Sequence, residues 1–201
     1  EALAGTVTDT SGAQITGTVT VNNSANTDVA ATLLSTIGAG SGGTVSVTAA
    51  VNITGNTTQL IDALDTKGVT ASTANLHLSD TPTVGNLQTL NGKTSGNILI
   101  SNGAITYTES AAVLAAALDG TVRDTSGNPL TGNMTLNTNP NATQLQTINN
   151  ATTGNVIIPN AGITLSGTPA VLVEALTGSV ATAGNAKISG TVTITTTNPD
   201  S

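Results

Sequence analysis

The sequence predicts an all-β fold, a multi-turn β-solenoid (β-helix) whose coils of about 29 residues form repeats of about 58 residues, with short helical corners. Three observations predict it: a long internal repeat, short segments that alternate apolar and polar residues, and a near absence of aromatic and charged residues. A chain that repeats one small unit buries its apolar faces by stacking neighbouring units.

The repeat is clearest between residues 75–119 and 133–177, which align at a constant offset without a gap. The opening EALAGTV (1–7) also matches EALTGSV (174–180). We therefore expect residues 1–201 to form a single repeat array, with about three repeats and the start of a fourth. Identical pairs at this offset include Leu87 and Leu145, Gln88 and Gln146, Thr89 and Thr147, and Asn91 and Asn149.

A recurring leucine divides each repeat into two halves, and each half is interpreted as one coil. Successive members of this series lie at a nearly constant spacing, close to half of the repeat. Stacked coils would pile these leucines into an internal aliphatic row. The series is Leu33, Leu60, Leu87, Leu114, Leu145 and Leu172.

Short segments in each half alternate β-branched or leucine residues with Thr, Ser or Asn, as expected of strands with one buried face. The predicted strands are 17–21, 43–47, 75–78, 97–100, 104–108, 134–136, 155–158, 163–166 and 187–195.

Other segments place apolar residues three or four apart, which predicts one or two helical turns at residues 57–64, 111–118, 142–148 and 169–176. Such helices are too short to be stable alone, so we interpret them as corners between strands. Pro82, Pro140 and Pro169 lie near helix starts, where a missing N–H is tolerated. Five glycines that follow the helical segments are expected to adopt left-handed dihedrals: Gly68, Gly96, Gly120, Gly154 and Gly178.

Composition argues against several functional classes. Four basic residues and a pI near 4.1 give no cationic surface for nucleic acid, so we expect no nucleic-acid partner. Without cysteine there are no disulfides or thiolate metal ligands. No apolar run is long enough to span a membrane, and the first residues do not resemble a secretion signal.

The motif DTSG occurs at 9–12 and 124–127, where Asp9 and Asp124 are weak candidates for calcium ligands. A β-turn that the Asp side chain stabilises is the favoured alternative, and apart from calcium we expect no cofactor. His77 has no partner for metal or acid–base chemistry, and the acids are spread thinly, so we expect no catalytic residues and no enzyme. A cleft lined by Asp62, Asp65 and Glu109 would reverse that view.

Polar side chains on the outward faces of strands allow two further uses. Thr18/Thr20 and Thr191/Thr193 could belong to an ice-binding array, although other repeats carry Asn or His there. Recurrent Asn97/Asn155 and Asn91/Asn149 are expected to stack as ladders of amide side chains.

The Thr/Asn-rich strands followed by QLQTINNATTG or AVLVEALTG resemble repeat arrays of giant bacterial cell-surface and extracellular proteins, of the β-solenoid adhesin or filament type. The GGxGxDxUx nonapeptide of calcium-binding repeats is absent, so the resemblance carries no calcium dependence. It implies an elongated protein outside the cell or on its surface.

Together these features predict a structural extracellular repeat protein that forms a fibre, sheath or adhesin stalk. Because the sequence starts and stops at the same phase of the repeat, we expect a homopolymer that stacks head to tail, or a piece of a longer chain. The alternative function is a surface-binding module that recognises ice or carbohydrate on a flat Thr/Asn face.

Overall fold

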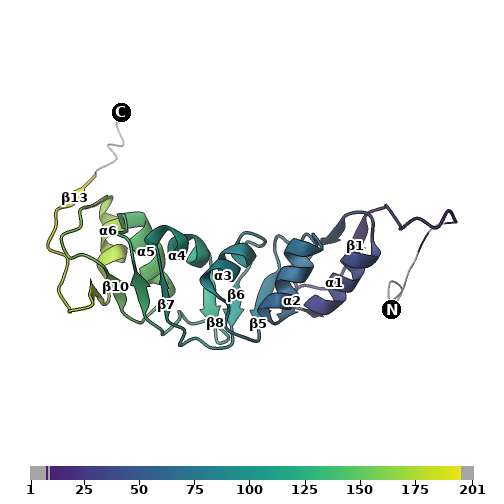
Figure 1. The fold of residues 1–201 in the computed structure, drawn as a ribbon, viewed down its shortest axis with the longest axis horizontal. Coiled ribbons are helices and arrows are strands. Elements are labelled where there is room, and N and C mark those ends of the chain that lie inside the picture. Colours follow the sequence, from purple (N-terminus) through teal and green to yellow (C-terminus); the bar gives the residue numbers. More distant parts are fainter. Residues whose placement is uncertain (1–7, 9, 196–201) are drawn as a thin grey trace. The chain divides into compact units, whose positions relative to one another are not determined.

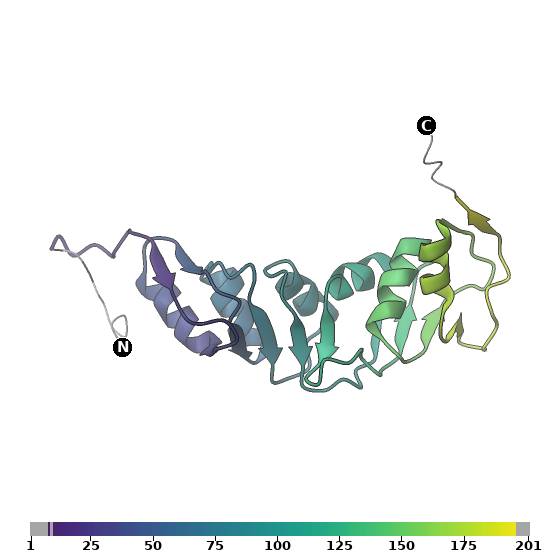
Figure 2. The same cartoon turned by 180° about the vertical axis from the view of Figure 1, so that it is seen from behind.

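The computed structural model describes residue 8 and residues 10–195. The chain falls into two compact units, Glu1–Ser101 (unit 1) and Asn102–Ser201 (unit 2). Each unit combines short parallel strands with helices. Within each unit the helices follow one another along one side of the strands (Figures 1 and 2).

Unit 1 alternates strands with helices in chain order. Its strands are β1 (Val19–Val21), β2 (Asp28–Ala30), β3 (Val45–Val47), β4 (Asn52–Gly55), β5 (Asn75–Leu78) and β6 (Ile98–Ile100). Its helices are α1 (Ala31–Gly40), α2 (Thr57–Ile61), which continues into the π-helix η1 (Asp62–Thr66), and α3 (Val84–Asn91). Strands β2, β4, β5 and β6 pair in that order, and β1 pairs with β3.

Unit 2 repeats this scheme. Its strands are β7 (Tyr107–Glu109), β8 (Val122–Asp124), β9 (Met134–Leu136), β10 (Val156–Ile158), β11 (Leu165–Gly167), β12 (Val180–Thr182) and β13 (Val192–Ile194). Its helices are α4 (Ala111–Leu118), α5 (Ala142–Ala151) and α6 (Pro169–Leu176). Strands β7, β9, β10 and β12 form one sheet, and β11 pairs with β13.

The all-β prediction is wrong. The chain is mixed α/β, 29% helical and 26% strand, with parallel sheets and six helices in the described part, so it is not an all-β β-solenoid. The error has a physical origin: each helix is too short to be stable alone, but neighbouring helices pack on one another and supply the missing stability. The helices that we interpreted as corners form a second layer beside the strands.

The expected coil length is also too long. Strand partners lie closer together in the sequence than one expected coil, since Leu76 pairs with Ile98 and Tyr107 pairs with Met134. The longer repeat is nevertheless visible in the structure, because whole helices and strands recur at its offset. Helix α6 begins and ends one repeat offset after α4, and β10 begins one repeat offset after β6. The repeat therefore describes an α/β unit.

The core of each unit is aliphatic, and the recurring leucines supply one row of it. Five of the six predicted leucines have exposures of 0 to 5%, but Leu33 is 60% exposed. The buried residue in α1 is Leu34, so the register we assigned to the first repeat is off by one residue. Burial raises the pKa of Tyr107, the single aromatic residue, to about 12.

A shared corner motif connects helix to strand in both units. In unit 1, the Thr94 hydroxyl donates to the Ala74 carbonyl of the preceding strand segment and accepts from the Gly96 N–H at 2.9 Å. A Cβ on Gly96 would lie only 2.2 Å from the Ala74 carbonyl oxygen. Gly96 is therefore required for close backbone approach, and it is not among the residues with positive φ.

The equivalent corner in unit 2 has the same bonds. Thr152 Oγ1 donates to the Gly132 carbonyl at 2.7 Å and accepts from the Gly154 N–H at 2.9 Å. A Cβ on Gly154 would lie 2.4 Å from the Gly132 oxygen. The predicted left-handed dihedral is thus wrong for Gly96 and Gly154, whereas it is confirmed for Gly68, Gly120 and Gly178.

The helix starts follow the sequence signals. Asn56 begins α2 and Asn141 begins α5 with a full capping box, in which the side chain of Gln59 or Gln144 accepts a hydrogen bond from the backbone N–H of the capping residue. Pro169 occupies the first turn of α6.

Candidate functional site

The second DTSG motif forms a tight turn at the end of β8. Asp124 Oδ1 accepts hydrogen bonds at 2.8 Å from the backbone N–H groups of both Ser126 and Asn128. The hydrogen bond from the Asn128 backbone is the main reason that the pKa of Asp124 lies below its ordinary value. The structure thus contains the β-turn that was the favoured alternative to a calcium site. Calcium binding at Asp124 stays a prediction. Asp9 lies outside the described residues.

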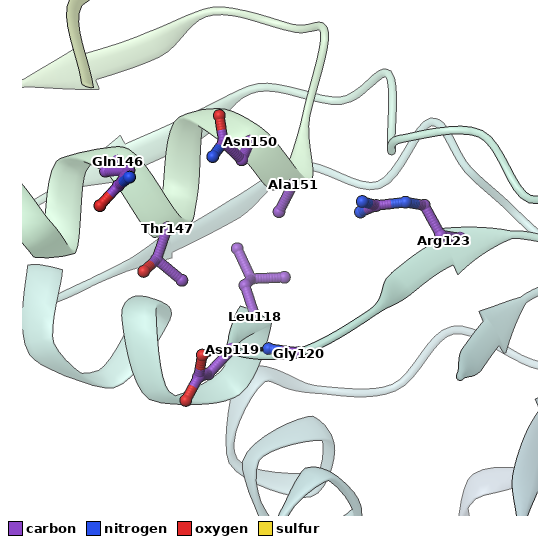
Figure 3. Close-up of a pocket in the computed structure, with 8 residues that line it drawn as sticks. All are labelled: Leu118, Asp119, Gly120, Arg123, Gln146, Thr147, Asn150 and Ala151. Atoms are coloured by element: carbon purple, nitrogen blue, oxygen red, sulfur yellow. Dashed lines mark hydrogen bonds between the residues drawn. The ribbon is translucent and has the colours of Figure 1, made fainter. Parts of the chain in front are cut away.

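A depression of about 170 Å³ lies between α4 and α5 (Figure 3). Leu118 forms its apolar floor and points toward Thr147 and Ala151 of α5. Polar groups from Asp119, Arg123 and the amides of α5 line the rim. The Arg123 guanidinium donates to the Val122 carbonyl at 2.9 Å, so part of its donor capacity serves the fold.

An amide–carboxylate cluster joins α5 to α6. The side-chain amides of Gln146 and Asn150 donate to Glu174 Oε2 at 2.7 and 2.9 Å. These two bonds, that from Gln146 first, hold the pKa of Glu174 below its ordinary value. Asn149 donates to the backbone carbonyls of Glu174 and Thr177 at the end of α6. The amides that reach the depression are therefore engaged in helix packing.

Unit 1 uses different groups at its helix contacts. The Ser35 hydroxyl of α1 donates to Asp62 Oδ2 of η1, and Lys93 forms an ion pair with Asp65 at 2.6 Å. A depression of about 330 Å³ beside this contact is lined by Thr32, Ser35, Thr58, Gln59 and Asp62.

The remaining candidates for chemistry have local roles. Glu109 accepts from the N–H of Ser110, at the start of α4, at 3.1 Å. His77 is half-buried on β5, opposite Thr54 on β4 and Leu99 on β6. Within residues 8 and 10–195, no three His, Cys, Asp or Glu side chains come together in a way that could hold a metal ion.

The outward-facing strand positions do not form a regular threonine array. In unit 2, Thr108 and Thr135 are adjacent, but the row continues with Ile157 and Ala181. In unit 1 the corresponding row runs from Ala30 through Thr54 and His77 to Leu99. Of the threonines predicted for such an array, Thr20 pairs with Ser46 and Thr193 pairs with Ser166, so these rows are not regular in threonine either.

Asparagine does form a ladder, at positions close to those predicted. Asn52 donates to Asp28 Oδ1 at 3.0 Å, Asn75 donates to Asn52 Oδ1 at 3.1 Å, and the Asn97 N–H donates to Asn75 Oδ1 at 3.0 Å. In unit 2, the N–H of Asn155 donates to Asn133 Oδ1 at 2.9 Å. Asn149 does not join this ladder, because its amide donates to carbonyls at the end of α6. The ladder bonds connect neighbouring strands and so serve the fold.

Sequence reasoning missed a set of exposed apolar side chains. In unit 1 these are Ile15 (39% exposed) and Leu33 (60%), and in unit 2 they are Val173 (64%), Leu176 (37%), Val192 (44%) and Ile194 (62%). The repeat offset could not reveal them: it aligns Leu176 with Leu118, which is 1% exposed, so the same repeat position is buried on α4 and exposed on α6.

In the part of the chain that the structure describes, no helix combines the length and apolar character needed to cross a bilayer. Comparison with family models, with curated proteins and with solved structures identifies no match. The site must therefore be interpreted from its own residues.

Proposed function

We propose that this chain is a structural segment of a fibre, sheath or adhesin stalk, located outside the cell or on its surface, that associates with further copies of itself. The single observation that carries the proposal is how its polar side chains are used. The buried hydroxyls of Thr94 and Thr152 and the amide of Asn149 all donate to backbone carbonyls of neighbouring segments of the same chain. Side chains committed in this way stiffen a scaffold and leave few groups for chemistry.

The composition supports the same proposal. Only 7% of residues are charged, so a contact between copies needs to bury few charges. Exposed apolar side chains on α1, α6 and β13 give such copies a reason to associate. A non-catalytic role without nucleic acid is part of this proposal.

The alternative is ice or carbohydrate recognition on a flat Thr/Asn face. Such binding needs a regular exposed array, and the interruptions at Ile157, Ala181 and His77 weigh against it.

Sedimentation velocity over a wide concentration range tests the proposal. We expect the average mass to rise continuously with concentration, because a structural segment of this kind should add copies at its ends. A single monomeric species at every concentration, together with specific binding to a glycan array or to ice, would replace the proposal with the alternative.

A further inference from the structure

Neighbouring helices meet in a fixed register in unit 1. Ser35 directly follows the buried Leu34 of α1, and it donates to Asp62, the second residue after the buried Leu60 of α2. Thus the residue one position after the core leucine of one helix faces the residue two positions after the core leucine of the next helix.

Unit 2 repeats this register with different residues. Gln146 directly follows the buried Leu145 of α5, and it donates at 2.7 Å to Glu174, the second residue after Leu172 of α6. The rule therefore holds at two helix contacts whose donor side chains differ in chemistry. Applied to α6 and α1, the same register assigns the side of each that would face a further helix.

On α6 the side that would face a next helix is apolar and open. Val173 follows the core leucine and is 64% exposed, and Leu176, one turn later, is 37% exposed. The same position on α4 is Leu118, which is 1% exposed because α5 covers it (Figure 3). The surface of α6 thus matches a surface that elsewhere in this unit is covered by a helix.

Helix α1 has the complementary open side. By the same register, the side of α1 that would face a preceding helix carries Leu33, which is 60% exposed, and Thr36, which is also exposed. The sequence phase agrees: the phrase LDGTVRDTSG (118–127) precedes α5, and the closely similar LAGTVTDTSG (3–12) precedes α1. Because α6 is followed by the related LTGSV (176–180), a helix of the α1 or α5 type is the one that fits next.

We propose that the Val173–Leu176 face of α6 binds the Leu33–Thr36 face of α1 from a second copy of this chain, with Val173 opposite Thr36. The inference rests on the proposed self-association and names its interface. The contact joins two different surfaces, so each copy keeps one of each free and association continues into a chain of copies. The helix order across the contact continues the order within each unit.

Cysteine cross-linking tests this contact, because the natural chain contains no cysteine. Val173→Cys and Thr36→Cys chains are prepared separately, mixed, oxidised mildly and separated on a non-reducing gel. We expect a covalent dimer between the two variants. The Val173→Cys chain mixed with a Ser101→Cys chain is the matched control, since Ser101 is exposed and lies outside both faces. The double variant Gln146→Cys/Glu174→Cys, built on the existing contact, shows the efficiency expected for this register.

A second variant separates contact from fold. Leu176→Glu places a charge on the open face, and we expect it to weaken association at least about tenfold while the circular dichroism spectrum stays that of the natural chain. Association that persists without the Val173–Thr36 cross-link, or a Val173–Val173 cross-link, would overturn this interface and leave the proposed function standing. No association of the natural chain at any concentration would overturn both.

Discussion

Units 1 and 2 share their corners but differ in their helix contacts. The corner at Thr94 and Gly96 and the corner at Thr152 and Gly154 have the same hydroxyl bridge and the same close backbone approach. At the helix contacts, a hydroxyl–carboxylate bond in unit 1 is replaced by a two-amide cluster on Glu174 in unit 2. The corners therefore maintain the fold, and the helix surfaces are where units can differ in function.

The largest effect is expected from adding a methyl group at a corner. Gly154→Ala would place Cβ 2.4 Å from the Gly132 oxygen, and Gly96→Ala would place it 2.2 Å from the Ala74 oxygen. Because backbone must move in both cases, we expect each to lower the free energy of unfolding by about 2–3 kcal/mol, measured by urea denaturation.

The matched control is Gly85→Ala in α3, where a Cβ meets nothing within 4 Å. A helical alanine is favoured over glycine, so this variant should gain up to about 1 kcal/mol. If the corner variants are as stable as this control, close approach does not explain the corner glycines.

Removing the corner hydroxyl should cost less. Thr152→Val keeps the shape of the side chain but leaves the Gly132 carbonyl and the Gly154 N–H without this partner, and we expect a loss of about 1–2 kcal/mol in thermal or chemical unfolding. Thr153→Val is the neighbouring control, because the backbone N–H of Thr153 still donates to Leu130 at 2.7 Å. Equal losses for the two variants would contradict a specific role for Thr152.

The capping boxes are a third shared feature, and their expected effect is smaller. Asn141→Ala removes the acceptor for the N–H of Gln144, and Asn56→Ala does the same for Gln59, at a cost of about 1 kcal/mol each. Asn141→Ser should retain most of the stability, since serine caps nearly as well. An alanine variant that unfolds at the same urea concentration as the serine variant would rule out the cap as a source of stability.

The smallest expected effect is on the pH dependence of stability in unit 2. In unit 2 the pKa of Glu174 is lowered in the folded chain, chiefly by Gln146, so the contribution of Glu174 to stability is present above the pKa of the unfolded state. It is lost as the pH falls through the folded-state pKa. We expect the carboxyl NMR signal of Glu174 to titrate at higher pH in Gln146→Ala than in the natural chain. An unchanged titration would mean that the amide bond does not act on the carboxylate.

Much of the local structure could be predicted from the sequence, because short-range signals set it. Four predicted helical segments, the prolines at helix starts and most of the strands occur where their residues indicated. The fold class was predicted wrongly because the helices are stabilised by packing on one another, as α5 packs on α6. The sequence of a single segment does not reveal such packing. Two helices, α1 and α3, and four strands, β2, β4, β8 and β12, lie outside the predicted segments. Length alone does not explain the missed strands, because β6 is as short as β2 and was predicted.

The site was harder to predict than the fold. The turn at Asp124 follows from local chemistry, and the sequence indicated it. The open face of α6 depends on which helix covers which, a property of register between segments that are distant in the sequence. The corner glycines were identified, but for the wrong reason at Gly96 and Gly154, because close backbone approach is visible only when the neighbouring carbonyl is placed.

The most direct test of the account is negative-stain electron microscopy of the purified chain over a concentration series, with and without a chelator. The account predicts end-to-end assemblies of uniform width in both conditions, because the proposed contact between α6 and α1 is apolar and needs no metal ion. Single, separate molecules at every concentration, or assemblies that disappear with the chelator, would contradict it.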